Sequence, residues 1–328
     1  MLCRNYNLKN YSNEIYFHNS LYFVIKETFN TFKKDISPFV YYKENISKVI
    51  FITFLIQWSL LIEDLPWSWK TTLAKAISKL LWLSFNRIHG TSDLIPQDII
   101  WGEYYNIERK VIEVRKWPIF TQLFLVDEIN RMNPKTQSAF LQAMEEKRVS
   151  IMGNDYDLPK RFCVIATQNP IEYTWTFALP EAQKDRFYAK ITLWSPSHEL
   201  QQKIITTNFY DSIQEYIWSL TQIITLEEWD DYFKKIKNIK INDDVARRFV
   251  LFFHFIRESE KILYPISQRW ISIFLLACKA NAFINERDYV IPEDGLELIE
   301  YFLIHRLDIE KSSFSVIWDV YKKSFKNF

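Results

Sequence analysis

One segment of this sequence has the layout of a phosphate-binding loop. The expected strand Ser59 to Glu63 leads into the loop Asp64-Leu65-Pro66-Trp67-Ser68-Trp69, and Lys70-Thr71-Thr72 follow at the start of a helix. In such a P-loop, backbone N–H groups and the helix N-terminus bind phosphates, the lysine reaches the terminal phosphates, and the next hydroxyl binds magnesium. This loop lacks both of the usual glycines, however. A lone Lys-Thr-Thr at a helix start is also more often a solvated first turn.

Two adjacent carboxylates follow another apolar strand. The run Leu123 to Val126 leads directly into Asp127 and Glu128. Acids at this place suit two steps of phosphate hydrolysis, because Asp127 can complete a magnesium shell while Glu128 orients or deprotonates the attacking water. The pair alone could equally be a solvated strand end. Together with the loop before Lys70, it predicts a site that hydrolyses a nucleotide.

The elements that must position these residues alternate between strands and helices. Short apolar runs that end in polar residues predict strands at Leu123 to Val126, Phe162 to Ala166 and Ala189 to Leu193, in addition to the strand before the loop. Helical stretches lie between them, including Thr72 to Leu81. This alternation predicts a largely parallel, doubly wound α/β sheet.

Other parts of the chain give weaker but definite patterns. After Ser195-Pro196-Ser197 the spacing is helical, with breaks near Pro265 and Pro292, so the second domain is expected to be all-α. Caps and turn residues predict three further features: helical spacing over Leu21 to Gln57 with a break at Ser37-Pro38, a helix from Asn133-Pro134 to about Glu146, and a β-hairpin of Val149 to Met152 and Tyr156 to Leu158 around Gly153-Asn154-Asp155.

Composition narrows the class of protein. A chain of 328 residues is too long for one ordinary compact domain, and 48% apolar with 25% charged residues are ordinary globular values. The net charge of +1 gives no overall attraction to nucleic acid or to an anionic membrane. Cys3, Cys163 and Cys278 fit reduced thiols, the histidines lack metal-ligand spacing, and the apolar run Val49 to Ile62 is too short to span a membrane. We therefore expect a cytoplasmic protein of two domains without a transition metal.

Glycine is scarce in this chain and tryptophan is abundant. The chain has 4 glycines and 12 tryptophans, whereas the usual glycine frequency of about 7% predicts roughly 23 glycines. Tryptophan in place of glycine at many positions would account for both numbers. The positions of the tryptophans are therefore the evidence that matters.

Two blocks of sequence carry a family resemblance. Residues 123–144, LFLVDEINRMNPKTQSAFLQAM, and residues 162–187, with ATQNPIE and LPEAQKDRF, closely resemble the MoxR family of AAA+ ATPases. The resemblance extends back through SFNRIHGTSDLIPQDI and forward to ERDYVIPED and HRL, and it covers about residues 30 to 310. It implies an N-terminal extension (1–28), an AAA+ core with a five-stranded parallel sheet between helices (29–196), and an all-α lid (197–328). Nucleotide is expected between core and lid, at the carboxyl ends of the strands.

Carried over to the matching residues, the resemblance implies a complete ATPase site for ATP and Mg²⁺. Asp127 and Glu128 would be the Walker B pair, Asn169 the sensor that positions the water, and Arg186 the arginine finger given to the neighbouring subunit's ATP. Arg269 would be the second sensor on the lid, although Pro265-Ile266-Ser267-Gln268 before it only partly fits the family pattern. Each arginine alone would more often form a surface ion pair. The nucleotide loop would comprise Asp64, Leu65, Pro66, Trp67, Ser68, Trp69, Lys70, Thr71 and Thr72, with Thr71 and Asp127 on magnesium.

The resemblance breaks at the glycines. The family's loop reads EDxPGxGKT, whereas this sequence reads EDLPWSWKT. Tryptophan also stands where the family tends to have glycine at Trp58, Trp82, Trp117, Trp175 and Trp194, and less consistently at Trp101 and Trp270. We hypothesise that the source organism reads the UGA codon as glycine, which suits a composition rich in Lys, Asn, Ile, Phe and Tyr, typical of an AT-rich genome. The alternative is that these are genuine core or interface tryptophans.

The function implied by the resemblance is ATP hydrolysis coupled to chaperone-like remodelling or maturation of partner protein complexes. An arginine that acts across subunits makes hydrolysis depend on assembly, so a homo-oligomeric ring, a hexamer, is expected. In this family the work is often shared with a protein that carries a von Willebrand factor A domain. The hairpin at 149–158 and the segment Arg87 to Ile99 match inserts that touch the client protein in related machines.

Two other functions remain open at this point. A nucleotide-binding-deficient scaffold becomes the better interpretation if Trp67 and Trp69 are genuine, because indoles would then occupy the phosphate site. A related AAA+ motor could act on nucleic acid or in metal chelation. The near-zero net charge and the lack of an extra basic domain argue against a nucleic-acid motor. The motifs DEINR and ATQNPIE favour the MoxR family over motors that act on nucleic acid or in metal chelation.

Overall fold

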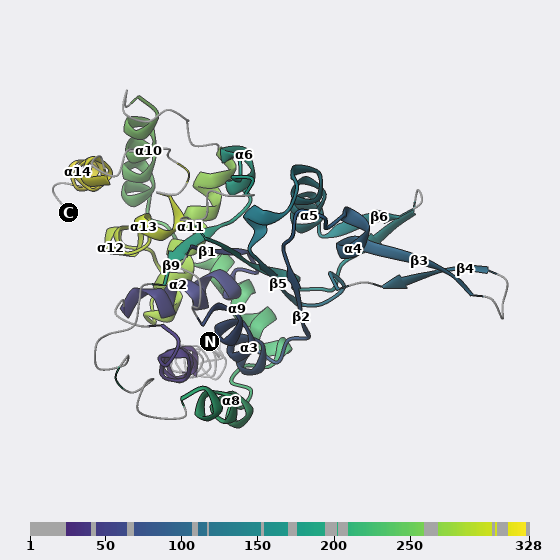
Figure 1. The fold of residues 1–328 in the computed structure, drawn as a ribbon. Coiled ribbons are helices and arrows are strands. Elements are labelled where there is room, and N and C mark those ends of the chain that lie inside the picture. The colour runs from purple at the N-terminus through teal and green to yellow at the C-terminus, as the bar shows by residue number, and fades with distance from the viewer. Residues whose placement is uncertain are drawn as a thin grey trace, which may run out of the picture.

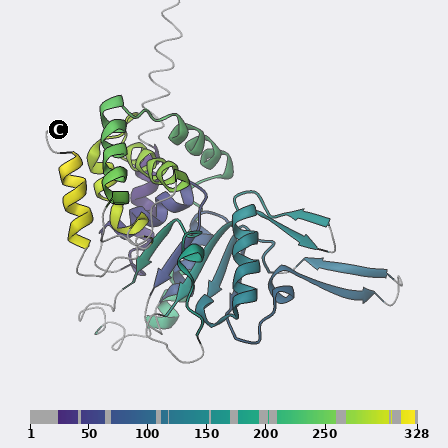
Figure 2. The same ribbon diagram turned by 90° about the horizontal axis from the view of Figure 1, so that it is seen from above.

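A central sheet, helices on both of its faces and two projecting hairpins make up the molecule (Figure 1). The structure is a computed structural model. It describes residues 24–40, 44–63, 69–106, 111–116, 118–151, 154–169, 176–193, 202, 209–258, 268–303, 306 and 314–325. Figures 1 and 2 show the hairpins at one end of the molecule and the C-terminal helices at the opposite end.

The central sheet has five parallel strands. Their order is β2 (Phe85–His89), β5 (Leu123–Asp127), β8 (Cys163–Gln168), β1 (Leu60–Glu63) and β9 (Ala189–Thr192). The strands β5 and β8 are almost entirely buried, which explains their continuous apolar sequence. The expected parallel, doubly wound α/β sheet is confirmed. Strand β2 was not predicted, because it lies at the edge and its residues are only half-buried or exposed.

Alternate residues of the strands supply two separate cores. Leu60 and Ile62 of β1 pack in a large cluster with α2 (Glu44–Leu55) and α3 (Lys70–Leu80), whereas Leu61 packs in a second cluster with α5 (Pro134–Glu146). Successive side chains of a strand point to opposite faces, so even a strand of four residues contributes to both clusters. The sheet is therefore held between helices, as the resemblance implied.

Local signals in the sequence set the ends of these helices. Asn133 Oδ1 accepts a hydrogen bond from the Thr136 backbone N–H at 3.0 Å, and Pro134 occupies the first turn of α5. Residues 24–36 are helical and residues 37–40 form a turn, which confirms the break at Ser37-Pro38. Helix α3 begins at Lys70, two residues earlier than the apolar spacing indicated.

Two antiparallel hairpins extend from the core. One is formed by β3 (Trp101–Asn106) and β4 (Val111–Lys116), and the other by β6 (Arg148–Ile151) and β7 (Asn154–Asp157). The second confirms the predicted hairpin but corrects its turn, because Asn154 pairs with Ile151. The first was not predicted. Residues 87–89 of the expected client-contacting segment Arg87 to Ile99 belong to β2 of the central sheet, and contact of this segment with a client stays a prediction.

The described residues after β9 are helical apart from their connections and one isolated bridge between Lys240 and Tyr289. Pro292 opens a helix, as expected, whereas Pro265 lies outside the described residues. The domain boundaries at 28 and 196 stay predictions. The bounds of the remaining helices are α4 (Pro96–Ile100), η1 (Ile129–Arg131), α6 (Glu181–Lys184), α8 (Phe209–Ser219), α9 (Leu226–Asn238), α10 (Asp243–Glu258), α11 (Gln268–Ile284), α12 (Pro292–Leu296), α13 (Ile299–Phe302) and α14 (Phe314–Ser324).

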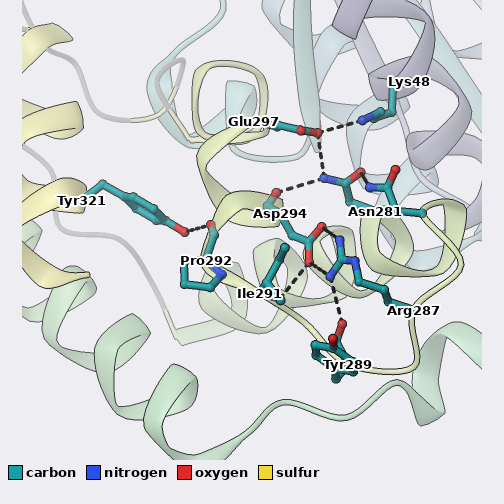
Figure 3. A network of polar contacts seen from close by, with 10 residues as sticks. Lys48, Asn281, Arg287, Tyr289, Ile291, Pro292, Asp294, Glu297 and Tyr321 are labelled. Atoms are coloured by element: carbon teal, nitrogen blue, oxygen red, sulfur yellow. Dashed lines mark hydrogen bonds and ion pairs between the residues drawn. The ribbon is translucent and has the colours of Figure 1, made fainter. Parts of the chain in front are cut away.

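A buried ion pair lies within the ERDYVIPED segment and holds it against its neighbours (Figure 3). Arg287 donates to both carboxylate oxygens of Asp294, at 2.8 and 2.5 Å, and the Ile291 backbone N–H donates to Asp294 at 2.9 Å. Asn281 in α11 donates to the Asp294 carbonyl at 3.3 Å. Gly295 follows, where a Cβ would lie 2.5 Å from the Tyr321 hydroxyl. This motif therefore stabilises the packing of α11, α12 and α14.

Two further expectations concern thiols and membranes. Cys163 and Cys278 are free and buried, and burial raises the pKa of Cys163 to about 11. Within the described part of the chain, no helix has both the length and the apolar composition needed to cross a bilayer.

Candidate functional site

The residues expected to bind phosphate lie between β1 and α3. Lys70 is the first residue of α3 and is 8% exposed, and Thr71 and Thr72 are half-buried in its first turn. The remaining loop residues, Asp64, Leu65, Pro66, Trp67 and Ser68, lie outside the described residues. A lysine and a threonine therefore open the helix that follows β1, which is where a helix N-terminus can bind phosphate.

Trp69 stands immediately before this helix. Its φ of −72° is an ordinary right-handed value, and its half-buried indole packs against the large core cluster. The described backbone at Trp69 therefore has no strain that glycine would relieve. An obstacle to phosphate at this position would therefore come from the bulk of the indole.

Asp127 and Glu128 lie at the carboxyl end of β5 and are both held by Thr167 of β8. The Thr167 hydroxyl donates to Asp127 Oδ1 at 2.6 Å and accepts from the Glu128 backbone N–H at 2.9 Å. Glu128 has a left-handed backbone, with φ of 56°, which turns the chain sharply after the strand. A threonine on the neighbouring strand thus fixes the Asp127 carboxylate and the Glu128 backbone, and it was not predicted.

Two arginines and a histidine surround the two carboxylates. Arg87 Nη2 lies 2.6 Å from Asp127 Oδ2, and Glu128 Oε2 lies 3.2 Å from His89 Nε2 and 3.0 Å from Arg131 Nε. Glu128 Oε2 is nevertheless a buried oxygen without a hydrogen-bond partner among the described residues. The contacts from His89 and Arg131 are therefore close approaches and not hydrogen bonds. Glu128 is therefore held at ion-pair distance with acceptor capacity left, as a group that binds a water requires.

Asn169 and the end of β1 complete this edge of the sheet. Asn169 follows β8 directly, is 4% exposed, and accepts a hydrogen bond from Asn130 Nδ2 at its carbonyl, at 3.3 Å. Glu63, the last residue of β1, binds Lys190 of β9 at 2.7 Å and accepts a hydrogen bond from Gln168 of β8. Glu63 thereby ties the end of β1 to both of its neighbouring strands.

Arg186 and Arg269 meet at a different carboxylate. Arg186 Nε lies 3.3 Å from Glu145 Oε2, and Arg269 of α11 donates a hydrogen bond to Glu145 Oε1. This hydrogen bond is the largest cause that raises the pKa of Arg269. The structure thus brings both expected arginines to the last turn of α5 and pairs them with Glu145 instead of with the acids at 127 and 128.

The described residues fit magnesium as this type of site uses it. Mg²⁺ in ATPase sites takes one or two carboxylates together with waters and substrate phosphates, instead of a cage of protein ligands. Asp127 supplies a carboxylate at the strand end, and Thr71 supplies a hydroxyl at the start of α3. The part of the chain that the structure describes holds no group of three or more His, Cys, Asp or Glu suited to a metal ion.

The tryptophans at family glycine positions have unequal surroundings. Trp82 has a left-handed backbone, with φ of 52°, and is 63% exposed. Trp58 stacks on Tyr188 with ring centroids 3.6 Å apart, and Trp270 is 3% exposed with a buried indole N–H that lacks a hydrogen-bond partner among the described residues. Trp101 is described only as part of β3, and Trp67, Trp117, Trp175 and Trp194 lie outside the described residues.

Thr167 and Glu145, which the sequence did not single out, both have partners far along the chain. Thr167 lies 40 residues from Asp127, and Arg269 lies 124 residues from Glu145. Strand register could have found Thr167, because β5 and β8 pair Val126 with Ala166. Sequence spacing gives no comparable signal for Glu145.

Comparison with known proteins agrees with this arrangement. The family described as "ATPase family associated with various cellular activities (AAA)" matches residues 59–189, and "AAA lid domain" matches residues 255–316. The chain is 35% identical to the uncharacterized protein YeaC of Bacillus subtilis, over 81% of this chain and 82% of that protein. It is 33% identical to Chaperone MoxR1 of Mycobacterium tuberculosis, over 75% of this chain and 67% of that protein. A crystal structure of a candidate ATPase from Cytophaga hutchinsonii is similar with a TM-score of 0.81 and 28% identity, covering 96% of this chain and 98% of that one.

Proposed function

Since the chain belongs to the MoxR family of AAA+ ATPases, we propose that it hydrolyses ATP and uses the energy to remodel or mature partner protein complexes. The observation that carries the proposal is the geometry of Glu128. A carboxylate oxygen that lies between a histidine and an arginine and keeps acceptor capacity can orient an attacking water. The relative named Chaperone MoxR1 supports the remodelling role.

The proposed division of labour follows from the positions of the residues. Lys70 and the N-terminus of α3 bind phosphate, and Glu128 takes or directs a proton of the water while Asn169 helps to place it. Magnesium, held by Thr71 and Asp127, would neutralise charge on the phosphates. Thr167 keeps Asp127 and Glu128 in register with each other, so that both can act on one phosphate.

Assembly is part of the proposal. Arg186 would reach the ATP of a neighbouring subunit, so the active form would be a ring, which we propose to be a hexamer. Arg269 shares Glu145 with Arg186, which supports a common role for the two arginines. The hairpins β3–β4 and β6–β7 project from the same end of the molecule and would contact the client. The assembly would work together with a protein that carries a von Willebrand factor A domain.

A scaffold that binds no nucleotide is the second candidate. It is favoured by Trp69, whose indole packs at the start of α3 next to Lys70. The codons decide between the two candidates. UGA codons for Trp67 and Trp69 in the coding DNA support a glycine loop and an ATPase, and UGG codons support the scaffold.

The ATPase is tested in the full chain carrying Trp67→Gly and Trp69→Gly, called the restored chain below. We expect magnesium-dependent ATP hydrolysis that stops when EDTA removes the metal. Lys70→Ala should abolish ATP binding, and Glu128→Gln should bind ATP without turnover, because the amide cannot take a proton. Arg186→Ala should bind ATP but lose about 10³- to 10⁵-fold in turnover.

Mixing subunits provides the control for action across a boundary. An excess of Lys70→Ala subunits, which keep Arg186, should restore turnover at sites of Arg186→Ala subunits. Full activity of Glu128→Gln, or a fully active strict monomer in sedimentation, would contradict the proposal.

A further inference from the structure

Arg306 is a buried arginine that follows the lid helix α13, and its side chain binds the segment 185–188, which carries Arg186. The side chain of Arg306 is 4% exposed. Its guanidinium donates to the carbonyls of Tyr188, at 3.2 Å, and of Phe187, and Nε lies 3.3 Å from Asp185 Oδ1. These partners lie on both sides of Arg186 in the sequence. Arg306 therefore holds the backbone of that segment immediately before and after the expected arginine finger.

The other contacts of Arg306 tie this segment to the lid. The guanidinium also donates to the carbonyl of Phe302, at the end of α13, and lies over the Trp270 ring at 3.0 Å from the centroid. Helix α13 packs beside β9, the strand that begins directly after Tyr188 (Figure 1). One side chain thus joins two helices of the lid to the start of a core strand.

Stability of the fold does not by itself explain why this guanidinium is buried, because burial of a charged group costs free energy. Desolvation lowers the pKa of Arg306 well below its usual range, and Asp185, its carboxylate partner among the described residues, has a side chain 44% exposed. Replacing a buried ion pair by apolar residues of similar volume is often neutral or stabilising. What an apolar residue could not do is direct several carbonyls of one segment toward a single point, which a planar guanidinium with five N–H donors does well.

Arg186 is also held from the lid at a second point. Its own guanidinium lies against Glu145, and the other oxygen of Glu145 accepts a hydrogen bond from Arg269 of α11. The backbone around Arg186 is thus fixed by Arg306, and its side chain is fixed through Glu145 by Arg269. Any displacement of the lid relative to the sheet must act on both attachments.

We propose that Arg306 is a positioning residue through which the lid of one subunit sets the placement of Arg186 toward the neighbouring subunit's ATP. The inference rests on the proposed function, because it needs Arg186 to act in that hydrolysis. Arg306 itself contacts no reacting atom. Its effect should therefore be on turnover, without an effect on ATP affinity in its own subunit.

Arg306→Lys in the restored chain is the direct test. Lysine keeps the charge, but its single ammonium cannot hold Asp185 and the carbonyls of Phe187 and Tyr188 in one plane. We expect kcat to fall roughly 10²-fold, the cost of a misplacement of about 1 Å, with ATP affinity by calorimetry unchanged. The double variant Arg186→Ala/Arg306→Lys should be no slower than Arg186→Ala alone, since both changes remove the same contribution.

Arg161→Lys is the matched control. Arg161 is also a buried arginine, with a side chain 5% exposed, and it also joins a core loop to a helix of the second domain through Asp230, at 2.6 Å. Within the described part of the chain its side chain bonds Asp230 and Leu226 and makes no hydrogen bond or ion pair with residues 185–188, so its replacement should lower the unfolding midpoint without the loss of kcat. Asp185→Asn, at an exposed residue that should not endanger folding, is the second variant, and we expect a smaller loss of kcat that is again absent in the Arg186→Ala background.

The outcomes separate the inference from the proposed function. Parental kcat in folded Arg306→Lys and Asp185→Asn, or losses that multiply with that of Arg186→Ala, would overturn the positioning role while leaving the ATPase in place. Parental activity of Arg186→Ala, or no hydrolysis in the restored chain, would overturn the proposed function and this inference with it.

Discussion

Trp229 in the helical domain and Trp82 in the nucleotide-binding core are in opposite situations. Trp229 is 1% exposed, its indole N–H donates to the Leu55 carbonyl at 3.3 Å, and the guanidinium of Arg161 lies 5.9 Å from its ring. Trp82 is 63% exposed and has a φ of 52°. The first position uses a large aromatic side chain with a polar edge, and the second uses a backbone conformation that favours glycine.

The conformation of Trp82 belongs to a regular helix ending. After α3, the Leu83 N–H donates to the Ser78 carbonyl at 2.8 Å and the Trp82 N–H donates to the Lys79 carbonyl at 3.2 Å. This is the Schellman pattern, whose left-handed residue is usually glycine. Gln57 and Lys147 also have positive φ, so the conformation alone does not identify a replaced glycine. Exposure of a large indole at such a position is the additional observation.

Not every position of the core that needs glycine has lost it. Gly90 follows β2, and a Cβ there would lie 2.3 Å from the Glu128 carbonyl oxygen. A backbone oxygen cannot yield easily, so glycine is required next to the proposed site. The difference between Gly90 and Trp82 is what a split between ordinary glycine codons and UGA would produce. The coding DNA tests this directly, since we expect UGA for Trp82 and UGG for Trp229.

The largest expected effect is at the phosphate loop. Three lost contacts to charged phosphate oxygens, at about 1.5 to 3 kcal/mol each, weaken ATP binding by at least about a thousandfold. We therefore expect no ATP binding at millimolar concentration by the chain with Trp67 and Trp69, and binding after both change to glycine. Calorimetry on the two proteins measures the difference.

The single changes sharpen this expectation. Trp69 has an ordinary negative φ, so Trp69→Ala should restore part of the binding if bulk alone is the obstacle. Tight ATP binding by the unaltered chain would show that an indole can be accommodated in this loop and would favour genuine tryptophans throughout the core.

Much of the fold could be predicted from the sequence because its signals are local. An apolar run predicts the strand that ends at Asp127, and a cap predicts the helix that begins after Asn133. The structure has both. The strand at Phe85–His89 could not be found this way, because an edge strand with exposed residues carries no apolar alternation. Its place in the sheet is decided by pairing with β5, which is a tertiary property.

The candidate site was predictable only in its residue types. A lysine after a strand and two acids after another predict phosphate chemistry, but the partners that hold those acids come from distant segments. Thr167 and His89 reach the acids at 127 and 128 through strand register, and Glu145 receives an arginine from the lid. The roles of Lys70, Glu128 and Arg186 stay predictions until the variants described above are measured.

The next effect in size concerns the helical domain. Trp229→Ala removes a fully buried indole and leaves the Leu55 carbonyl without that donor, and changes of this kind cost about 3 to 5 kcal/mol. Trp218→Ala is the control, since Trp218 is 73% exposed and its described partner is Lys79 at 4.7 Å from the ring. We expect the control to change the free energy of unfolding by less than about 1 kcal/mol. Urea titrations that gave similar losses for the two variants would remove the distinction between used and misplaced tryptophans.

The smallest effect is the most specific test of the left-handed position. Trp82→Gly and Trp82→Ala both remove the indole, so packing losses cancel between them and the backbone preference remains. At a φ of 52° alanine should be less stable than glycine, by about 1 to 2 kcal/mol for a left-handed residue with a Cβ. At Trp218, in the last turn of α8, the order should reverse, because glycine is less favourable than alanine in a helix, by up to about 1 kcal/mol. The measurement is the urea midpoint of the four variants, and the sign of the glycine-minus-alanine difference at each site is the result. Equal stability of the two variants at position 82 would mean that the chain relaxes there at no cost, and that Trp82 gives no support to a glycine read from UGA.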